Sequence, residues 1–235
     1  MIERTTLLEI QDAMPLFEES NLPPCTFNLK VMPGDCIIIE CRDPVTSSAF
    51  ADLCSGMIPL ETGAVYFNNL DWGKLKEPRL SALRGRIGRI TQKGSWIDMY
   101  PMSINILLPL LHHTKLDLKD ITSEAMELCY DFDLPGIPID SPRHLSSIDL
   151  ARAACVRAFL GQPDLLLFEY PLENYAAELS VPFMTMLNNA QNRGAGIICF
   201  TRQLSIWSNY RQNVTQWMNL QERGLTVSGS YSVDV

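Results

Sequence analysis

Short, wholly apolar runs alternate along this chain with longer stretches of helical periodicity. Cys36–Ile39 and Leu165–Phe168 are apolar at every position. Such runs are typical of strands that are buried on both faces of a mostly parallel sheet. Gly196–Thr201 is a third buried strand by the same criterion. Because helical stretches separate these strands, the pattern predicts an α/β domain.

Further strands are expected toward both ends of the chain. Near the N-terminus we expect Thr6–Gln11 and Thr26–Val31, and the second alternates between apolar and polar positions as a half-buried strand does. Ala64–Phe67 follows a turn at Gly63. At the C-terminal end, the pattern predicts a closing hairpin from Thr215–Leu220 and Leu225–Ser228.

The middle of the chain is predicted to be helical. Met102–Leu111, Ile121–Phe132 and Leu150–Leu160 have apolar residues at helical spacing, and a proline-rich loop separates the last two. A helical insertion is therefore expected between two parts of the chain that contain strands. The remaining expected elements are the helices Pro78–Arg84 and Val181–Asn192 and the strand Ile87–Thr91.

Composition and charge narrow the possible functions. The 235 residues suit one large domain, and the net charge of −8 argues against nucleic-acid binding by neutralisation of phosphates. The seven cysteines form no C-x-x-C pair, and the three histidines lack ligand spacing, so no metal site is expected. No apolar stretch approaches the ~20 residues of a membrane span. We therefore expect a cytoplasmic protein whose membrane association, if any, is through a partner.

One segment, Cys41–Gly56, lies where a phosphate-binding loop belongs, between the buried strand Asp35–Glu40 and an expected helix at Ser48–Ser55. A phosphate loop reads G-x-x-x-x-G-K-[ST], because glycine lets amides close around phosphates and lysine reaches the terminal phosphate. Cys41 and Thr46 replace the glycines here and Ser47 replaces the lysine. Ser48 keeps its type, and could be either an Mg²⁺ ligand or a helix N-cap.

Several motifs follow one another in an order that resembles the ATPase subunits of ABC transporters along nearly the whole chain. Gln92 follows a strand as the Q-loop glutamine does, and Leu145–Asp149 is similar to the L-S-G-G-Q signature. Gln162–Pro171 resembles the Walker B stretch, including its Pro-Asp lead and trailing proline. The segment Gly94–Leu110 and the short C-terminus look most like Mla/MCE-type lipid-transport ATPases.

This resemblance implies a specific fold. It implies a P-loop NTPase-like, mostly parallel sheet core with an N-terminal antiparallel β part and a helical subdomain insertion. Residues 1–235 would form a single nucleotide-binding-domain-like domain, with the helical subdomain at about 93–158 inserted in the RecA-like core.

The resemblance also identifies remnants of a nucleotide site, namely Phe17, Ser47, Ser48, Gln92, Glu169, Tyr170 and Arg202. Phe17 falls near the adenine-stacking aromatic, or is a core residue. Glu169 takes the place of the Walker B aspartate, and Tyr170 that of the catalytic glutamate; a phenol is a poor base at neutral pH. Arg202 replaces the switch histidine and is expected to pair with Glu169 or with a phosphate.

The signature is altered as well. Its remnant comprises Leu145, Ser146, Ser147, Ile148 and Asp149. In the family this loop reaches the partner subunit's γ-phosphate, and here Ser147 and Ile148 replace its glycines. Ile148 is expected to add bulk where the backbone must come close.

Taken together, these departures predict a pseudo-ATPase with no catalytic residues of its own. The resemblance implies a transmembrane permease and a second ABC ATPase subunit, identical or different, as partners, at the inner face of the cell membrane. No cofactor is certain, and the binding of ATP with Mg²⁺ at a degenerate or composite site stays an open alternative. The permease would dock between Gln92 and the helical insertion; candidate contacts, which could equally be subdomain core, are Trp96, Met99, Tyr100, Met102 and Ile104.

Two alternatives to the pseudo-ATPase stay open. One is a slow but genuine transporter ATPase, with Glu169 as metal ligand and a lysine supplied in trans. The other is a soluble scaffold or regulator that works without a permease.

Overall fold

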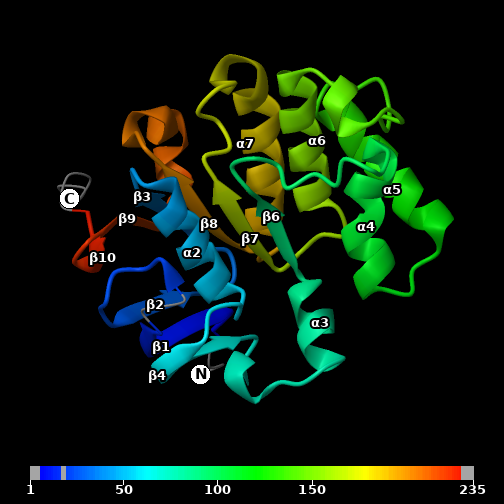
Figure 1. Cartoon of the computed structure of the whole chain (residues 1–235). Helices are drawn as coiled ribbons and strands as arrows, with labels where there is room; N and C mark the ends of the chain where they lie inside the picture. Colours follow the sequence, from blue (N-terminus) through cyan, green and yellow to red (C-terminus); the bar gives the residue numbers. More distant parts are fainter. Residues whose placement is uncertain (1–5, 17–19, 229–235) are drawn as a thin grey trace.

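The structure is a computed structural model that describes residues 6–16 and 20–228 (Figure 1). Within them the chain forms two sheets and a group of helices. Phe17, the expected adenine-stacking residue, lies outside the described residues.

The larger sheet has six strands in the order β10-β9-β3-β8-β7-β6. All neighbouring pairs are parallel except β9 and β10, which form the hairpin predicted at the C-terminal end. The strands are β3 (Cys36–Glu40), β6 (Ile87–Ile90), β7 (Leu165–Glu169), β8 (Gly196–Thr201), β9 (Gln216–Gln221) and β10 (Gly224–Val227). Every residue of β7 and β8 is buried, as their uniform hydrophobicity predicted.

The smaller sheet is antiparallel, with the order β2-β1-β4-β5. Its strands are β1 (Leu8–Pro15), β2 (Phe27–Val31), β4 (Leu60–Phe67) and β5 (Leu70–Asp71). β1 continues four residues beyond the predicted end. It does so through an irregularity between Ile10 and Ala13, where Asp12 has a φ of 43°, and this interrupts the two-residue alternation that sequence patterns rely on.

The six-stranded sheet separates two hydrophobic cores. On one face, Ile37 and Ile39 pack with α2 (Pro44–Cys54) and the antiparallel sheet. On the other face, Cys36 and Ile38 pack with the helices α6 (Ser147–Phe159) and α7 (Ala176–Asn192). Successive side chains of β3 point to opposite faces of the sheet, because side-chain direction alternates along a strand. Helix α2 lies between the two sheets (Figure 1).

The predicted helical insertion is present. α4 (Met102–His113) and α5 (Leu118–Asp131) pack against each other and against α6, at the right of Figure 1. β6 packs so closely against α6 that a Cβ on Gly88 would lie only 2.0 Å from the carbonyl oxygen of Ala158. The division of the chain into one domain with a subdomain at about 93–158 stays a prediction.

Smaller elements complete the connections. They are the helix α3 (Arg79–Arg84) and the 3-10 segments η1 (Trp72–Lys74), η2 (Pro142–His144) and η3 (Leu204–Asn213). η3 was not predicted, because its composition is polar apart from Leu204, Ile206, Trp207 and Tyr210. Within the described part of the chain, no helix combines the length and the apolar character that a membrane crossing requires.

Candidate functional site

The segment expected to be a phosphate loop is wound into a helix. α2 begins at Pro44, four residues before the predicted start at Ser48. Asp43 is its N-cap: the carboxylate accepts the amide N–H groups of Val45 at 3.1 Å and Thr46 at 3.2 Å. The hydroxyl of Thr46 donates to the same carboxylate at 2.6 Å. The prediction that Ser48 could be the N-cap is therefore wrong, because the helix already includes it.

This cap has a direct electrostatic meaning. The N-terminus of a helix attracts anions through its free amides and its dipole. In α2 a carboxylate of the chain itself takes these amides. The hydrogen bonds from Thr46 hold the pKa of the Asp43 carboxyl below its usual value, so the group is ionised at neutral pH.

Ser47, at the position of the phosphate-loop lysine, is completely buried. Its hydroxyl donates to the carbonyl oxygen of Pro44 at 3.0 Å, inside the first turn of α2. The Ser47 side chain is therefore part of the packed interior beside α2, and this position carries no positive charge.

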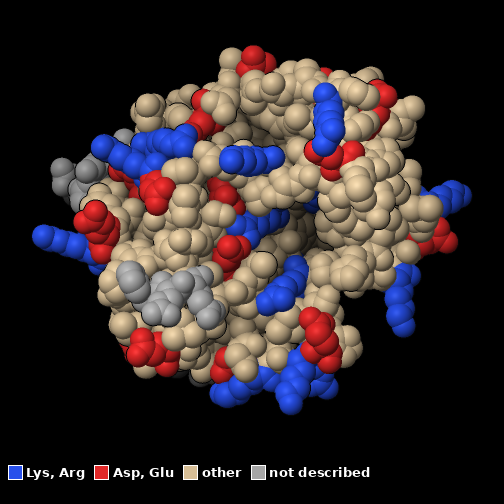
Figure 2. All heavy atoms as spheres, in the orientation of Figure 1, with Lys and Arg blue, Asp and Glu red and all other residues tan. Residues whose placement is uncertain are grey.

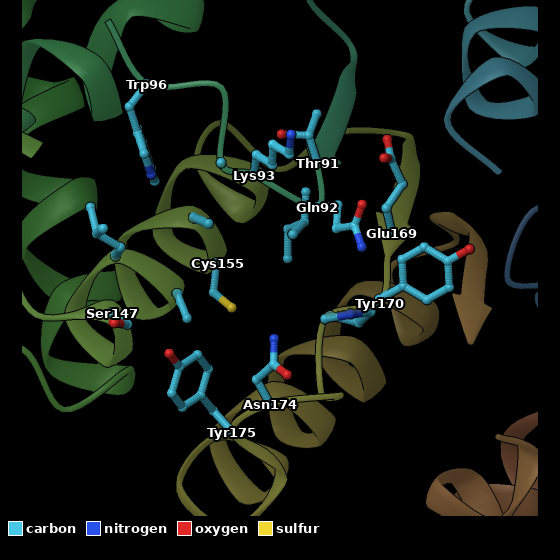
Figure 3. Close-up of a pocket in the computed structure, with 16 residues that line it drawn as sticks. Thr91, Gln92, Lys93, Trp96, Ser147, Cys155, Glu169, Tyr170, Asn174 and Tyr175 are labelled. Atoms are coloured by element: carbon cyan, nitrogen blue, oxygen red, sulfur yellow. The ribbon is translucent and has the colours of Figure 1, made fainter. Parts of the chain in front are cut away.

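Tyr170, at the position of the catalytic glutamate, is tied to the same loop. Its hydroxyl donates to the carbonyl oxygen of Cys41 at 3.1 Å, and burial raises the pKa of the phenol. In Figure 3 its ring points away from the pocket that the other labelled residues surround. The phenol is therefore a structural hydrogen-bond donor and is not placed to activate water.

Arg202 does not contact Glu169, contrary to one of the two expected pairings. Its guanidinium forms an ion pair with Glu173, and its backbone N–H donates to the same carboxylate at 2.9 Å. The guanidinium also lies 4.6 Å from the ring centroid of Tyr170. Glu173 thus holds Arg202 over the aromatic ring.

Glu169 pairs instead with Arg89, a residue of the edge strand β6. Nε of Arg89 donates to Oε1 of Glu169 at 2.9 Å, and Nη2 lies 2.8 Å from the same oxygen. Nη2 also donates to the hydroxyl of Ser48 at 3.1 Å, while Nη1 pairs with Asp52. The Glu169 side chain is only 2% exposed and that of Arg89 20%. One guanidinium therefore joins β6, β7 and α2.

The charge of Arg89 is secured by this environment. Burial alone would lower the pKa of the guanidinium, but the charges and hydrogen bonds of Glu169 and Asp52 outweigh burial and raise it. The sequence did not single out Arg89, because this residue lies in a short strand with no motif of its own. The one indication of its role is the strand pairing, because β6 lies beside β7, the strand that ends in Glu169.

The residues present do not fit an Mg²⁺ ion. Ser48 and Glu169, the two expected ligands, both contact the guanidinium of Arg89. Mg²⁺ requires oxygen ligands in near-octahedral geometry at about 2.1 Å, and the guanidinium fills the space between these oxygens. Among the described residues, no group of three or more histidines, cysteines and carboxylates could hold a metal ion.

Five of the predicted site residues line one cavity of about 240 Å³: Gln92, Trp96, Ser147, Glu169 and Tyr170. Figure 3 shows Asn174 and Tyr175 pointing into it from the segment after β7. Gln92 is exposed in the turn that follows β6. The cavity therefore brings together the Q-loop position, the start of the signature helix and the Walker B position, whereas Ser47, Ser48 and Arg202 do not line it.

The signature remnant forms the N-terminus of α6. Ser146 is the N-cap: its hydroxyl accepts the N–H of Asp149 at 3.2 Å and donates to the Asp149 carboxylate at 2.7 Å. Ile148 is half-buried against the helical core together with Leu145, so its bulk is directed inward rather than freely exposed. Ser147 is exposed. A carboxylate of the chain therefore lies at the N-terminus of both helices, Asp43 as the N-cap of α2 and Asp149 in the first turn of α6.

The expected permease contacts differ in their exposure to solvent. Met99 is 87% exposed and Tyr100 46% exposed. Met102 is completely buried in the helical core, so its candidacy as a docking residue is wrong. Ile104 is half-buried, and Trp96 is half-buried with Arg157 4.1 Å from its ring centroid.

Basic and acidic side chains are intermixed on the face shown in Figure 2. The same view shows this face hollowed between α2 and the helical part. The hollow lies next to β6, which carries Arg89 at the point where the sheet meets α2.

This architecture is that of an ABC ATPase cassette. The solved dimeric MJ0796, described as a bacterial ABC transporter cassette, superposes with a TM-score of 0.77 at 18% identity, over 92% of this chain and 94% of that one. The structure of another ABC transporter ATP-binding subunit gives a TM-score of 0.78 at 18% identity, over 94% and 90% of the two chains. The predicted fold class is confirmed.

The curated relatives include ATP-binding proteins of transport systems. The phosphonates import ATP-binding protein PhnC of Hyphomonas neptunium is 23% identical over 202 residues, which are 82% of this chain and 76% of PhnC. The intermembrane phospholipid transport ATP-binding protein MlaF of Escherichia coli K12 is 26% identical over 74% of this chain and 66% of MlaF. MlaF of Haemophilus influenzae is 27% identical over 61% of this chain and 54% of its own length.

No protein-family model matches the sequence. The chain nevertheless resembles ABC transporter ATP-binding subunits both in sequence and in fold, and the similarity to MlaF agrees with the Mla-like features of the sequence.

Proposed function

We propose that this chain is a catalytically degenerate subunit of an ABC transporter, which pairs with a second ATPase subunit and docks a membrane permease without hydrolysing ATP. The observation that carries the proposal is the cap of α2. The amides at the phosphate-loop position donate to Asp43 of the chain itself, and the segment Cys41–Ser48 contains no lysine.

The electrostatics of the loop support this proposal. A triphosphate at the start of α2 would have to displace the Asp43 carboxylate or lie next to it. Arg42 is the only basic residue in Cys41–Ser48, and it lines an adjacent cavity together with Glu40, Asp43 and Glu222. Three carboxylates thus line the same cavity as the basic residue of this segment, which disfavours the binding of a polyanion there.

The transition-state chemistry is also disfavoured. Phosphoryl transfer depends on positioned positive charge and on a group that orients the attacking water. The lysine, the catalytic glutamate and the switch histidine are replaced by Ser47, Tyr170 and Arg202. Because loss of a single charge-stabilising donor already costs about 10²–10³ in rate, measurable turnover is not expected.

The alternative of a slow but genuine ATPase requires Glu169 as a metal ligand. The contacts of Glu169 with Arg89 disfavour that role, and we therefore place it second. A scaffold without a permease is the third possibility, and the likeness to transport ATP-binding proteins disfavours it.

A composite site with a competent partner subunit stays open. There the partner would supply the phosphate loop and this chain the Leu145–Asp149 segment. Asp149 places a carboxylate in the first turn of α6, so the affinity of such a site for ATP is expected to be low. We propose that the subunit pairing does not depend on this site.

The permease contact is proposed at the exposed pair Met99 and Tyr100, beside the turn that contains Gln92. The bound subunit would lie on the cytoplasmic face of the membrane. Because two of the relatives are named for intermembrane phospholipid transport, a lipid is the transported substrate that we propose.

Two measurements test the proposal. The purified chain should release phosphate from ATP no faster than buffer, next to an active ABC ATPase as a positive control. Turnover that Ser48→Ala or Glu169→Gln abolishes would overturn it. Affinity purification of the tagged chain from detergent-solubilised membranes should recover a membrane subunit, and a complex without one would favour the scaffold.

A further inference from the structure

The guanidinium of Arg89 occupies the ligand atoms that a divalent cation would use. We infer that Arg89 is a built-in counter-cation that permanently replaces the metal, and that its removal uncovers a divalent-cation site at Ser48, Asp52 and Glu169. The inference rests on the proposed function, and it explains how Ser48, Asp52 and Glu169 stay together in the absence of a metal ion.

The geometry is the first argument. Ser48 and Asp52 are four residues apart in α2, so they lie on the same face of the helix. Glu169 ends β7, and all three side chains present oxygen atoms to one guanidinium. A hydroxyl and two carboxylates from two separate elements thus converge on a single positive group, as oxygen ligands do around a hard cation.

The charge balance is the second argument. Arg89 contributes one positive charge, and Glu169 and Asp52 contribute two negative ones. Without Arg89, the two carboxylates would be left with a charge that one divalent cation neutralises. Glu169 is only 2% exposed, so water cannot take over the role of the lost partner.

The position of Arg89 is fixed independently of its partners. Its neighbour Gly88 brings β6 against the backbone of α6, where any side chain would collide. β6 also pairs in register with β7, with Arg89 opposite Leu167. The sheet therefore holds the backbone of Arg89, and a substitution of Arg89 should remove the charge without moving the strand.

The test is a titration of the full chain with Mn²⁺, followed by the paramagnetic resonance of the free ion and by thermal unfolding. Arg89→Met keeps much of the apolar stem and removes the charge. Arg86→Met is the matched control, because Arg86 pairs with Asp164 at the opposite, N-terminal end of the same two strands and its side chain is 59% exposed. We expect Arg89→Met to bind Mn²⁺ at least about tenfold more tightly than the wild type, and to unfold at a higher temperature when Mn²⁺ is present.

The double variant Arg89→Met/Glu169→Gln keeps the inference testable if Arg89→Met alone does not fold. It removes the cation and also the buried negative charge, so it should fold better than Arg89→Met and should lose the Mn²⁺ response. Mn²⁺ binding by Arg89→Met no tighter than by the wild type and Arg86→Met would overturn the inference, as would an unchanged response in the double variant. ATP turnover by the wild type would overturn the proposed function instead, so the two failures are distinguishable.

Discussion

Nε and Nη2 of Arg89 both lie within 2.9 Å of the same carboxylate oxygen of Glu169. Because Glu169 is almost completely buried, this pair is the principal compensation of its charge. Removing one member of a buried ion pair leaves the other uncompensated and costs about 3–5 kcal/mol.

Arg89→Ala is accordingly expected to lower the free energy of unfolding by about 3–5 kcal/mol. Arg202→Ala removes an ion pair whose arginine is 39% exposed, and should cost only about 1 kcal/mol. Urea denaturation of both variants measures the difference. Equal losses would mean that Arg89 contributes no more than a surface pair.

Asp43→Ala is expected to cost about 1 kcal/mol of stability, because it removes the cap of α2. Asp43→Asn should lose less, since its one side-chain oxygen can still accept from either Val45 or Thr46. A comparable loss in both variants would argue against capping as the role of Asp43.

The same cap makes stability depend on pH. The pKa of Asp43 is lowered in the folded protein, first by the hydrogen bond from Thr46. Its contribution is therefore fully present above the ordinary aspartate pKa of about 3.9 and is lost as the pH falls through the lower, folded-state value. The difference in stability between wild type and Asp43→Asn should shrink over this acid range and stay constant above it, as measured by denaturation at each pH.

Ser47→Lys restores the lysine of the motif but is expected to destabilise the protein rather than to create a nucleotide site. Ser47 is fully buried in a helix, and an unpaired charge there costs several kcal/mol. Thermal unfolding with and without ATP tests this. An ATP-dependent rise in the melting temperature of the variant would contradict the expectation.

Tyr170→Glu should not produce turnover, because the lysine is still missing and Arg89 still holds Glu169. Tyr170→Phe isolates the hydrogen bond to Cys41 and should cost about 1 kcal/mol. A phosphate-release assay on the first variant and denaturation of the second provide the measurements. ATPase activity gained by the single change to glutamate would show that the site is closer to competence than its geometry indicates.

The proposed permease surface is tested by Met99→Asp, which places a charge on the most exposed residue of that surface. Recovery of the membrane subunit in pull-downs should fall about tenfold or more, as is common when a central apolar contact is lost. Val181→Asp is the matched control, because Val181 is 76% exposed on α7. Equal losses in both variants would place the contact elsewhere.

The buried strands were predictable from sequence because their signal is local. Cys36–Ile39 and Leu165–Phe168 can only be apolar throughout if both faces are covered, and both are strands of the central sheet. The N-terminus of α2 was misplaced because the phosphate-loop frame suggested an open loop, whereas Asp43 followed by Pro44 is itself a helix-start signal.

The role of Arg89 could not be predicted in this way. Its partners Ser48, Asp52 and Glu169 are 37 to 80 residues away along the chain. Their convergence depends on the order of strands in the sheet, which local patterns do not specify. Glu173 was likewise not expected as the partner of Arg202, since it lies in an irregular segment between β7 and α7.

The cation that joins β6, β7 and α2 is covalently part of the chain, so its occupancy does not vary. The junction of these three elements would therefore keep the same geometry at every concentration of ATP and of free magnesium. In the transporter that we propose, sensing of the cell's energy state would then fall to the partner subunit.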